Sequence, residues 1–117
     1  MNANAHPPSL VYVGDPMCSW CYGFTVPLAQ VLAARPGVPV HLVLGGLRAY
    51  NTQVMDAAMK ATIRHHWETV AERSGQPFNF ALFERTDFIY DTEPACRAVV
   101  TVRAQLPALA LPLYHAI

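Results

Sequence analysis

Two short apolar runs joined by a helical segment constrain the fold of this chain most strongly. The first run, residues 10–13 (LVYV), is rich in β-forming side chains and is followed by Gly-Asp-Pro at 14–16. The second run, residues 38–44, ends at a pair of glycines. Between the runs, apolar side chains recur at helical spacing until Arg-Pro-Gly at 35–37, where proline and glycine stop a helix. Because strands joined through a helix must be parallel, the sequence predicts an α/β fold that begins with a β-α-β unit.

A long helix is expected after the second run. Apolar side chains recur there at three- and four-residue spacing, which is the pattern of a helix with one buried face. The members of this stripe are Met55, Met59, Ile63, His66, Trp67 and Val70. Asn51 or Thr52 is expected to cap the helix, and Gly75, followed by Pro77, to end it.

Three local signals complete the prediction of secondary structure. Pro27 lies inside the first helical segment and is expected to kink it, since proline removes one intrahelical hydrogen bond. Residues 78–90 are rich in aromatic side chains without a period, which indicates a packed connector with a helical turn. Thr-Glu-Pro at 92–94 opens a further helix, and residues 109–117 begin another apolar segment.

The charge balance excludes an electrostatic nucleic-acid binder. Eight Lys and Arg residues match eight Asp and Glu residues, so the formal net charge is zero, whereas such a binder needs a basic patch. Apolar residues make up 53% of the chain and charged residues 14%, which excludes a disordered protein. Since no apolar run approaches the roughly 18 residues that cross a bilayer, we expect neither nucleic acid nor a membrane as a partner.

The amino terminus and the cysteine count favour the cytoplasm. The first eight residues, MNANAHPP, contain no basic residue and no apolar stretch of signal-peptide length. The chain has three cysteines, Cys18, Cys21 and Cys96, and an odd number does not indicate a framework of structural disulfides. In a reducing compartment, a Cys-x-x-Cys pair points to redox chemistry or to a metal site.

Cys18 and Cys21 are the residues expected to carry the chemistry. The first strand leads into a turn, and Cys18 begins the following helix with Cys21 one turn further in. Unpaired peptide N–H groups at a helix start stabilise a thiolate, and a three-residue offset lets the two cysteines form a disulfide. The carboxyl edge of the sheet leaves Cys18 accessible and shields Cys21. We therefore predict Cys18 as the attacking thiol and Cys21 as the resolving thiol.

Neighbours of the pair provide candidate modulating and substrate-binding residues. Asp15 opposes a thiolate at Cys18, but as an exposed carboxylate it would be screened by solvent. Trp20 and Met17 are candidates for the rim that contacts apolar substrate segments, although packing explains Trp20 equally well. Cys96 is interpreted as a small core residue rather than a third redox thiol.

A metal site is the main alternative use of the cysteine pair. Zinc takes four ligands, commonly from two closely spaced pairs. The remaining candidates, Cys96, His41, His65 and His66, show no ligand spacing apart from the two adjacent histidines, whose side chains diverge on a helix. We expect no metal and no organic cofactor.

Residues 15–24, DPMCSWCYGF, resemble the active-site segment of DsbA-like thioredoxin-fold oxidoreductases. The resemblance is closest to the cytosolic FrnE-type branch, described as predicted protein-disulfide isomerases. Further matching segments are Gly-Gly-Leu-Arg at 45–48, His-Trp at 66–67, Gly-Gln-Pro-Phe at 75–78 and Thr-Glu-Pro-Ala-Cys-Arg-Ala-Val at 92–99. The resemblance implies a thioredoxin fold interrupted by a helical insertion, with Cys18 as nucleophile and Cys21 as resolving cysteine.

The resemblance also divides the chain into three parts. Residues 1–9 form a polar leader, residues 10–48 the amino-terminal β-α-β portion of the thioredoxin fold, and residues 49–117 a truncated helical insertion. Members of the family continue into a second half with two more strands, a final helix and a cis-proline loop that faces the cysteine pair. We expect that carboxyl-terminal half to be missing from this chain.

The predicted function is thiol–disulfide exchange on protein or small thiol and disulfide substrates, as a reductase or isomerase in the cytoplasm. An external thiol such as glutathione or thioredoxin would recycle the pair. Two alternatives remain. One is a glutathione transferase of the kappa type, or a related isomerase, on the same scaffold. The other is a non-enzymatic truncated interaction module. For any of these functions, an uncovered sheet edge would let two copies of the chain associate into a homo-oligomer.

Overall fold

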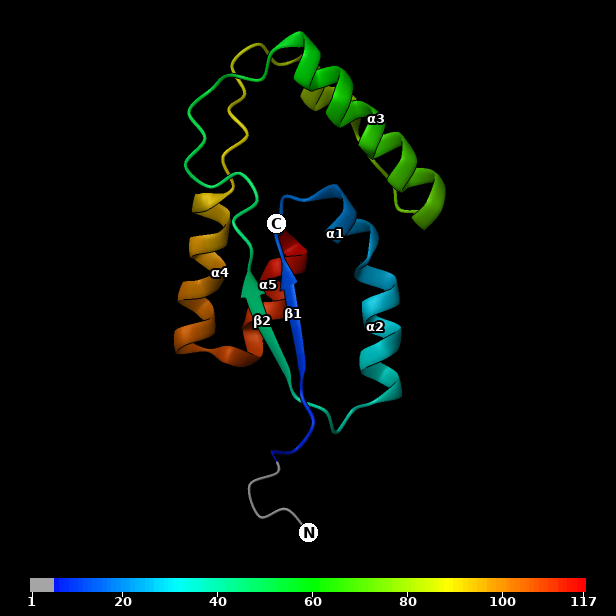
Figure 1. Ribbon diagram of the computed structural model, residues 1–117, viewed down its shortest axis with the longest axis vertical. Helices are drawn as coiled ribbons and strands as arrows, with labels where there is room; N and C mark the ends of the chain where they lie inside the picture. Colours follow the sequence, from blue (N-terminus) through cyan, green and yellow to red (C-terminus); the bar gives the residue numbers. More distant parts are fainter. Residues whose placement is uncertain (1–5) are drawn as a thin grey trace.

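The structure, a computed structural model, describes residues 6–117 and has the expected α/β architecture (Figure 1). Its elements are β1 (Leu10–Gly14), α1 (Ser19–Gly23), α2 (Thr25–Ala34), β2 (Val40–Leu44), α3 (Ala57–Ser74), the 3-10 helix η1 (Phe80–Glu84), α4 (Glu93–Gln105), the 3-10 helix η2 (Pro107–Leu109) and α5 (Ala110–Ala116). Residues 6–9 of the predicted polar leader are exposed, and residues 1–5 lie outside the described part.

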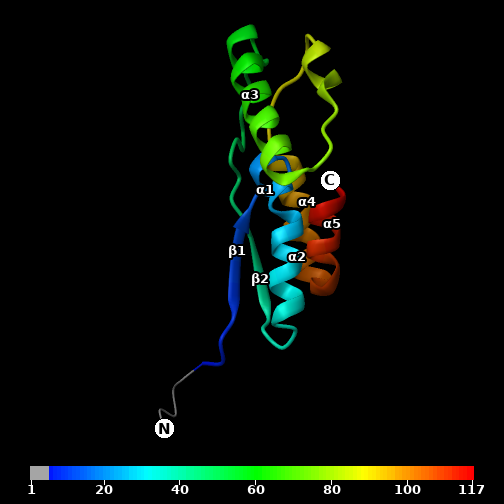
Figure 2. The same ribbon diagram turned by 90° about the vertical axis from the view of Figure 1, so that its right-hand side faces the viewer.

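β1 and β2 form the predicted parallel pair. Leu10 lies opposite Val40, and the register continues to Gly14 opposite Leu44. The helices α2, α4 and α5 all lie on one side of this sheet (Figure 2). The other face is open, with Val11 59%, Val13 61% and Val43 41% exposed. The alternation of buried and exposed side chains along both strands therefore reflects a sheet that is covered on one face.

The helical segment between the strands consists of two helices rather than one kinked helix. α1 ends at Gly23 and α2 begins at Thr25, so the break falls at Phe24, three residues before the expected kink at Pro27. Pro27 has no N–H to donate to the Gly23 carbonyl, and its ring crowds that carbonyl. The helical hydrogen bonding resumes with Leu28, whose N–H donates to the Phe24 carbonyl at 2.9 Å.

The long helix α3 begins later than predicted. Asp56 is its cap, because the Asp56 carboxylate accepts a hydrogen bond from the Met59 N–H at 2.8 Å. The predicted cap at Asn51 or Thr52 is wrong, since the Asn51 side chain instead donates to the Tyr90 carbonyl at 3.1 Å. The end of α3 is as predicted, at Gly75, whose φ of 73° is the left-handed conformation that glycine adopts readily.

The remaining helices follow the sequence pattern. Residues 78–90 contain the expected helical turn, η1, and α4 begins directly after Thr92. The last apolar segment forms α5. His66 is exposed, although the helical stripe predicted it on the buried face of α3. Within residues 6–117, no helix combines the length and the apolar character needed to cross a membrane.

Most of the buried apolar side chains fall into two separate clusters, and the molecule is elongated, 58 × 29 × 23 Å. Its radius of gyration is 16.6 Å, against about 13 Å for a compact chain of this length. The sheet-side cluster contains Leu42, Val99, Ala110 and Tyr114. The aromatic cluster contains Met55, Ile63, Phe83 and Tyr90, with Trp67, Phe80 and Phe88 packed against it. In Figure 1, α3 and η1 lie beyond the end of the sheet, and these two elements contribute Ile63 and Phe83 to the aromatic cluster.

Candidate active site

Cys18 and Cys21 lie where β1 passes into α1. The Cys18 N–H donates to the Asp15 carbonyl at 3.1 Å and closes a turn after the strand. Cys18 is the cap of α1 in an extended conformation, and Cys21 lies in the first turn of that helix, as predicted. Both cysteines are reduced, and they approach each other to 3.7 Å. This separation is close enough for the two thiols to share a proton.

Asp15 fixes the turn that carries Cys18. Its carboxylate accepts hydrogen bonds from the Met17 N–H and the Leu47 N–H, each at 2.9 Å, and lies 3.6 Å from the Cys96 sulfur. These contacts join the cysteine turn to the loop after β2 and to α4. Asp15 is only 3% exposed, so the expectation of a solvent-screened carboxylate is wrong. Its side chain is buried because it satisfies two peptide N–H groups that would otherwise lack partners.

The two thiols differ in what surrounds them more than in how deeply they are buried. Both are half-buried, in contrast to the expectation that only Cys21 is shielded. Cys18 lines two cavities, of about 260 Å³ and about 230 Å³. Cys21 packs against the sheet-side cluster. A substrate entering either cavity therefore meets Cys18.

The hydrogen bond between the thiols dominates their acidity. With the shared proton on Cys18, this bond and burial raise the pKa of Cys18, while the peptide N–H groups of Cys21 and Trp20 lower it by less. The same bond lowers the pKa of Cys21 to about 5, against the opposing effect of burial. The two thiols titrate as a pair that loses its first proton easily and its second with difficulty.

Two tyrosine hydroxyls contribute to the environment of Cys21. The hydroxyls of Tyr12 and Tyr114 lie 3.3 Å apart, and hydrogen bonds from both lower the pKa of Cys21. Burial raises the pKa of each tyrosine, so both remain neutral donors. Tyr12 was counted among strand formers and Tyr114 among the residues of the last apolar segment. The sequence signal that could have identified them is a tyrosine, with its polar hydroxyl, at a position of each element that faces the interior.

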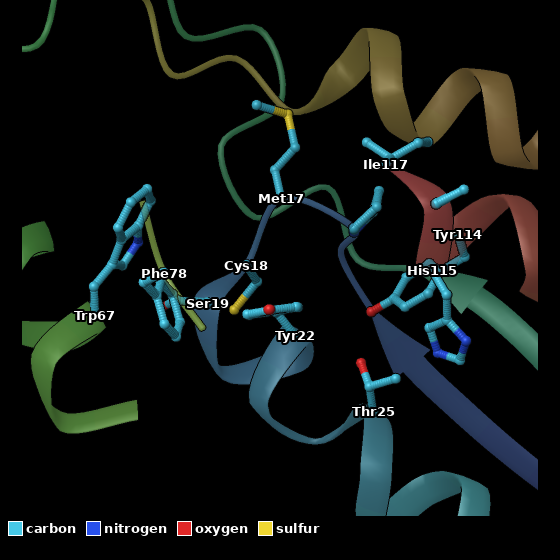
Figure 3. A pocket seen from close by; sticks show the side chains of 12 residues that line it. Met17, Cys18, Ser19, Tyr22, Thr25, Trp67, Phe78, Tyr114, His115 and Ile117 are labelled. Atoms are coloured by element: carbon cyan, nitrogen blue, oxygen red, sulfur yellow. The ribbon is translucent and has the colours of Figure 1, made fainter. Parts of the chain in front are cut away.

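The larger cavity is built from three distant parts of the chain. Figure 3 shows Cys18 between Trp67 and Phe78 on one side and Tyr114 and His115 on the other. Met17 also lines this cavity, together with Ser19, Tyr22, Thr25 and the last residues of the chain. Trp67 was predicted only as a core residue, and the contribution of the last residues has no signal in the sequence.

The smaller cavity lies on the other side of Cys18. Its lining residues are Cys18, Ser19, Trp20, Leu47, Arg48, Ile63, His66 and Tyr90. Trp20 is 44% exposed, with the guanidinium of Arg73 5.7 Å from the centre of its ring. The structure thus places Met17 and Trp20 at separate cavities beside Cys18, and their roles in substrate binding stay predictions.

Cys96 lies apart from the cysteine pair. It is buried on α4, as expected for a small core residue, and its thiol faces Asp15. Burial, together with the Asp15 charge, raises the pKa of Cys96, so its thiol is a poor nucleophile. In the part of the chain that the structure describes, no three His, Cys, Asp or Glu side chains group as metal ligands do.

The solved structures that resemble this chain include two that match nearly all of it. One is described as a "putative protein disulfide isomerase" from Nitrosomonas europaea, with a TM-score of 0.83 and 37% sequence identity over 95% of this chain and 53% of that one. The other is the cytosolic disulfide reductase DsbM from Pseudomonas aeruginosa with GSH, with a TM-score of 0.71 and 32% identity over 92% of this chain and 52% of that one. No protein-family model and no curated protein matches the sequence.

These comparisons confirm the resemblance and the fold class. The chain is an α/β protein with a DsbA-like thioredoxin fold, in which a two-stranded parallel sheet is followed by helices. It spans about half the length of each of the two structures.

Proposed function

We propose that this chain carries the reactive dithiol of a thiol–disulfide oxidoreductase. The observation that carries the proposal is the reduced Cys18–Cys21 pair, 3.7 Å apart, at the end of β1 with Cys18 facing two cavities. The resemblance to a disulfide reductase and to a protein described as a disulfide isomerase supports the same chemistry. The exchange needs no metal or organic cofactor.

The proposed reaction begins when the proton shared by the two thiols moves from Cys18 to Cys21. The Cys18 thiolate then attacks one sulfur of a substrate disulfide, forming a mixed disulfide while the other substrate sulfur leaves as a thiolate and takes up a proton. Cys21 then attacks the Cys18 sulfur and passes its proton to the second substrate sulfur, which leaves as a thiol, while the first leaving thiolate takes its proton from water. The substrate disulfide has been reduced to two thiols, and Cys18 and Cys21 have been oxidised to a disulfide.

An external thiol is needed to complete the cycle. Two equivalents of a small thiol such as glutathione would reduce the Cys18–Cys21 disulfide and leave as a disulfide of their own. The cytosolic location and the bound GSH named for the Pseudomonas reductase support a reductase or isomerase in the cytoplasm that uses such a thiol. Protein disulfides are also candidate substrates, because Trp67, Phe78 and Met17 give the larger cavity an apolar wall.

Trapping the mixed disulfide tests the proposal. The Cys21→Ser variant should accumulate a mixed disulfide at Cys18 when it is incubated with oxidised glutathione, because the resolving step is removed. The Cys18→Ser variant should form much less adduct, and a Cys96→Ser control should behave like the wild type since that thiol is buried. Mass spectrometry of the peptides locates the adduct. Absence of any adduct on Cys18 in the Cys21→Ser variant would contradict the proposal.

The two alternatives give different results in the same variants. A glutathione transferase of the kappa type needs no second thiol, so Cys21→Ser would keep full conjugating activity. An interaction module is favoured by the open apolar sheet face around Val11, Val13 and Val43. It predicts association on a sizing column without turnover of disulfides, and a Val13→Lys variant would return the chain to a monomer.

A further inference from the structure

We infer that Arg48 forms an anion subsite beside Cys18, which selects small thiols and disulfides that carry a carboxylate. This inference rests on the proposed function and deepens it by naming the substrate class. Arg48 and Cys18 line the same cavity of about 230 Å³, so one small molecule can contact both. A substrate sulfur would meet the Cys18 sulfur while its carboxylate meets the guanidinium.

The state of Arg48 indicates that its guanidinium is available for a ligand. Its Nε is buried and has no hydrogen-bond partner among the described residues. Within residues 6–117, Arg48 takes part in no ion pair. Buried polar groups are almost always satisfied, so an arginine that lines a cavity and has an unpaired Nε favours a ligand that accepts hydrogen bonds from its guanidinium. A carboxylate fits this geometry because it can accept from two nitrogens of a guanidinium at once.

The position of Arg48 is fixed by its neighbours. Its guanidinium lies 5.0 Å from the centre of the Tyr90 ring, and its backbone N–H donates to the Thr92 hydroxyl at 3.1 Å. Tyr90 is itself buried in the aromatic cluster, and its hydroxyl donates to the Met17 carbonyl in the cysteine turn. A side chain held in this way loses little conformational freedom when it binds a ligand.

The charges around the cavity also favour an anion. None of the residues that line it is acidic, and His66 from α3 adds a second side chain that can donate. Asp15 lies in the cysteine turn but does not line this cavity, and its oxygens already accept from the Met17 and Leu47 N–H groups. Asp15 therefore reduces the positive potential of Arg48 without occupying its guanidinium.

A pair of alkylating agents of the same size tests the subsite without requiring any disulfide exchange. In the Cys21→Ser variant, the rate of alkylation at Cys18 is measured with iodoacetate, which is anionic, and with iodoacetamide, which is neutral. The ratio of the two rates cancels the fraction of thiolate. Adding Arg48→Gln should lower this ratio by about fivefold or more, whereas Arg48→Lys should lower it less. The matched control Arg97→Gln removes an exposed guanidinium on α4 and should leave the ratio unchanged.

A second experiment needs no arginine variant and separates failure of the subsite from failure of the proposed function. Three small symmetrical disulfides, 3,3′-dithiodipropionate, 2-hydroxyethyl disulfide and cystamine, carry negative, neutral and positive ends. Mixed-disulfide formation at Cys18 should be fastest with 3,3′-dithiodipropionate and slowest with cystamine. High salt should reduce the differences between the three rates. Equal rates, or an iodoacetate ratio that Arg48→Gln and Arg97→Gln change alike, would overturn the subsite while leaving the exchange proposal intact. No reaction with any of the three would overturn the exchange proposal and the substrate assignment together.

Discussion

The sheet region and the aromatic region of this molecule are built on different principles. The sheet region has a small, mainly aliphatic core on one side of β1 and β2 and leaves the other side open. The aromatic region packs rings around Trp67, whose centre lies 4.8 Å from that of Phe83 and 5.2 Å from that of Phe78. The first region supplies the cysteines, and the second supplies walls of both cavities beside Cys18.

α1 is the element through which the two regions meet. It follows directly from β1, and it packs against α3 at Gly23. The Tyr22 hydroxyl also donates to the Pro77 carbonyl at 2.7 Å, beyond the end of α3. The reactive pair is therefore positioned by the strand but enclosed by the aromatic region. Disturbing either region should affect Cys18 in a different way.

The largest expected effect comes from the aromatic core. Phe83→Ala should lower the free energy of unfolding by about 3–5 kcal/mol, because it removes a buried ring and leaves a cavity. Urea unfolding measures the loss, and hydrogen exchange locates it in α3 rather than in β1 and β2. Equal loss of protection in both regions would show that they are a single unit, contrary to the comparison.

The contact between the regions can be disturbed at Gly23. A Cβ added there would lie 2.5 Å from the Cγ1 of Val70, so Gly23→Ala should destabilise the chain by about 1–3 kcal/mol and push α1 from α3. The measurement is again the free energy of unfolding. Val70→Ala in the same background removes the colliding methyl and should recover part of the loss. If the losses of unfolding free energy in Gly23→Ala and Val70→Ala were strictly additive, α1 and α3 would not be in contact at Gly23 and Val70.

The thiol pair should make the stability of the sheet region depend on pH. The pKa of Cys21 is lowered to about 5 from an ordinary value of 9.0, so its thiolate stabilises the fold fully above pH 9 and progressively less as pH falls towards 5. The pKa of Cys18 is raised from the same ordinary value of 9.0, so Cys18 lowers the stability of the fold only above pH 9. Between pH 5 and 9 the reduced protein should therefore gain stability relative to the variant with both cysteines replaced by serine. A difference that is flat with pH would contradict the pairing.

The smallest effect is expected from a single hydroxyl. Tyr114→Phe removes a donor to Cys21 and should raise the pKa of that thiol, which the absorbance of the thiolate at 240 nm follows against pH. Tyr22→Phe is the matched control, because its hydroxyl bonds to Pro77 and not to a cysteine. A larger shift of the Cys21 pKa in Tyr22→Phe than in Tyr114→Phe would show that the Tyr114 hydroxyl does not stabilise the Cys21 thiolate.

Sequence reasoning succeeded where the signal is local. The two strands follow from short β-branched runs bounded by glycine and proline, and the end of α3 follows from a glycine that adopts positive φ. The position of Cys18 at the start of a helix follows from the glycine and proline that end the first strand. Pro27 was predicted to disturb the first helical segment. The break falls earlier than Pro27 because the carbonyl that loses its hydrogen-bond donor belongs to Gly23, four residues before the proline.

The parts of the site that could not be predicted depend on contacts between distant segments. Asp15 is buried because a peptide N–H 32 positions away needs an acceptor. Tyr114 reaches Tyr12 across 102 positions, and its hydroxyl changes the acidity of Cys21. The segment Gly-Gly-Leu-Arg was identified only as part of the family resemblance, and its arginine received a proposed role only because the fold places it at the same cavity as Cys18.

The pH dependence of cysteine alkylation tests the central claim most directly. The reduced wild-type chain is treated with iodoacetamide from pH 4 to pH 10, and mass spectrometry of the peptides gives separate rates for Cys18 and Cys21. The pair should react with a midpoint below about pH 7, well under the pKa of about 8.5 for a free thiol. A midpoint at or above 8.5 for both cysteines would contradict an activated dithiol.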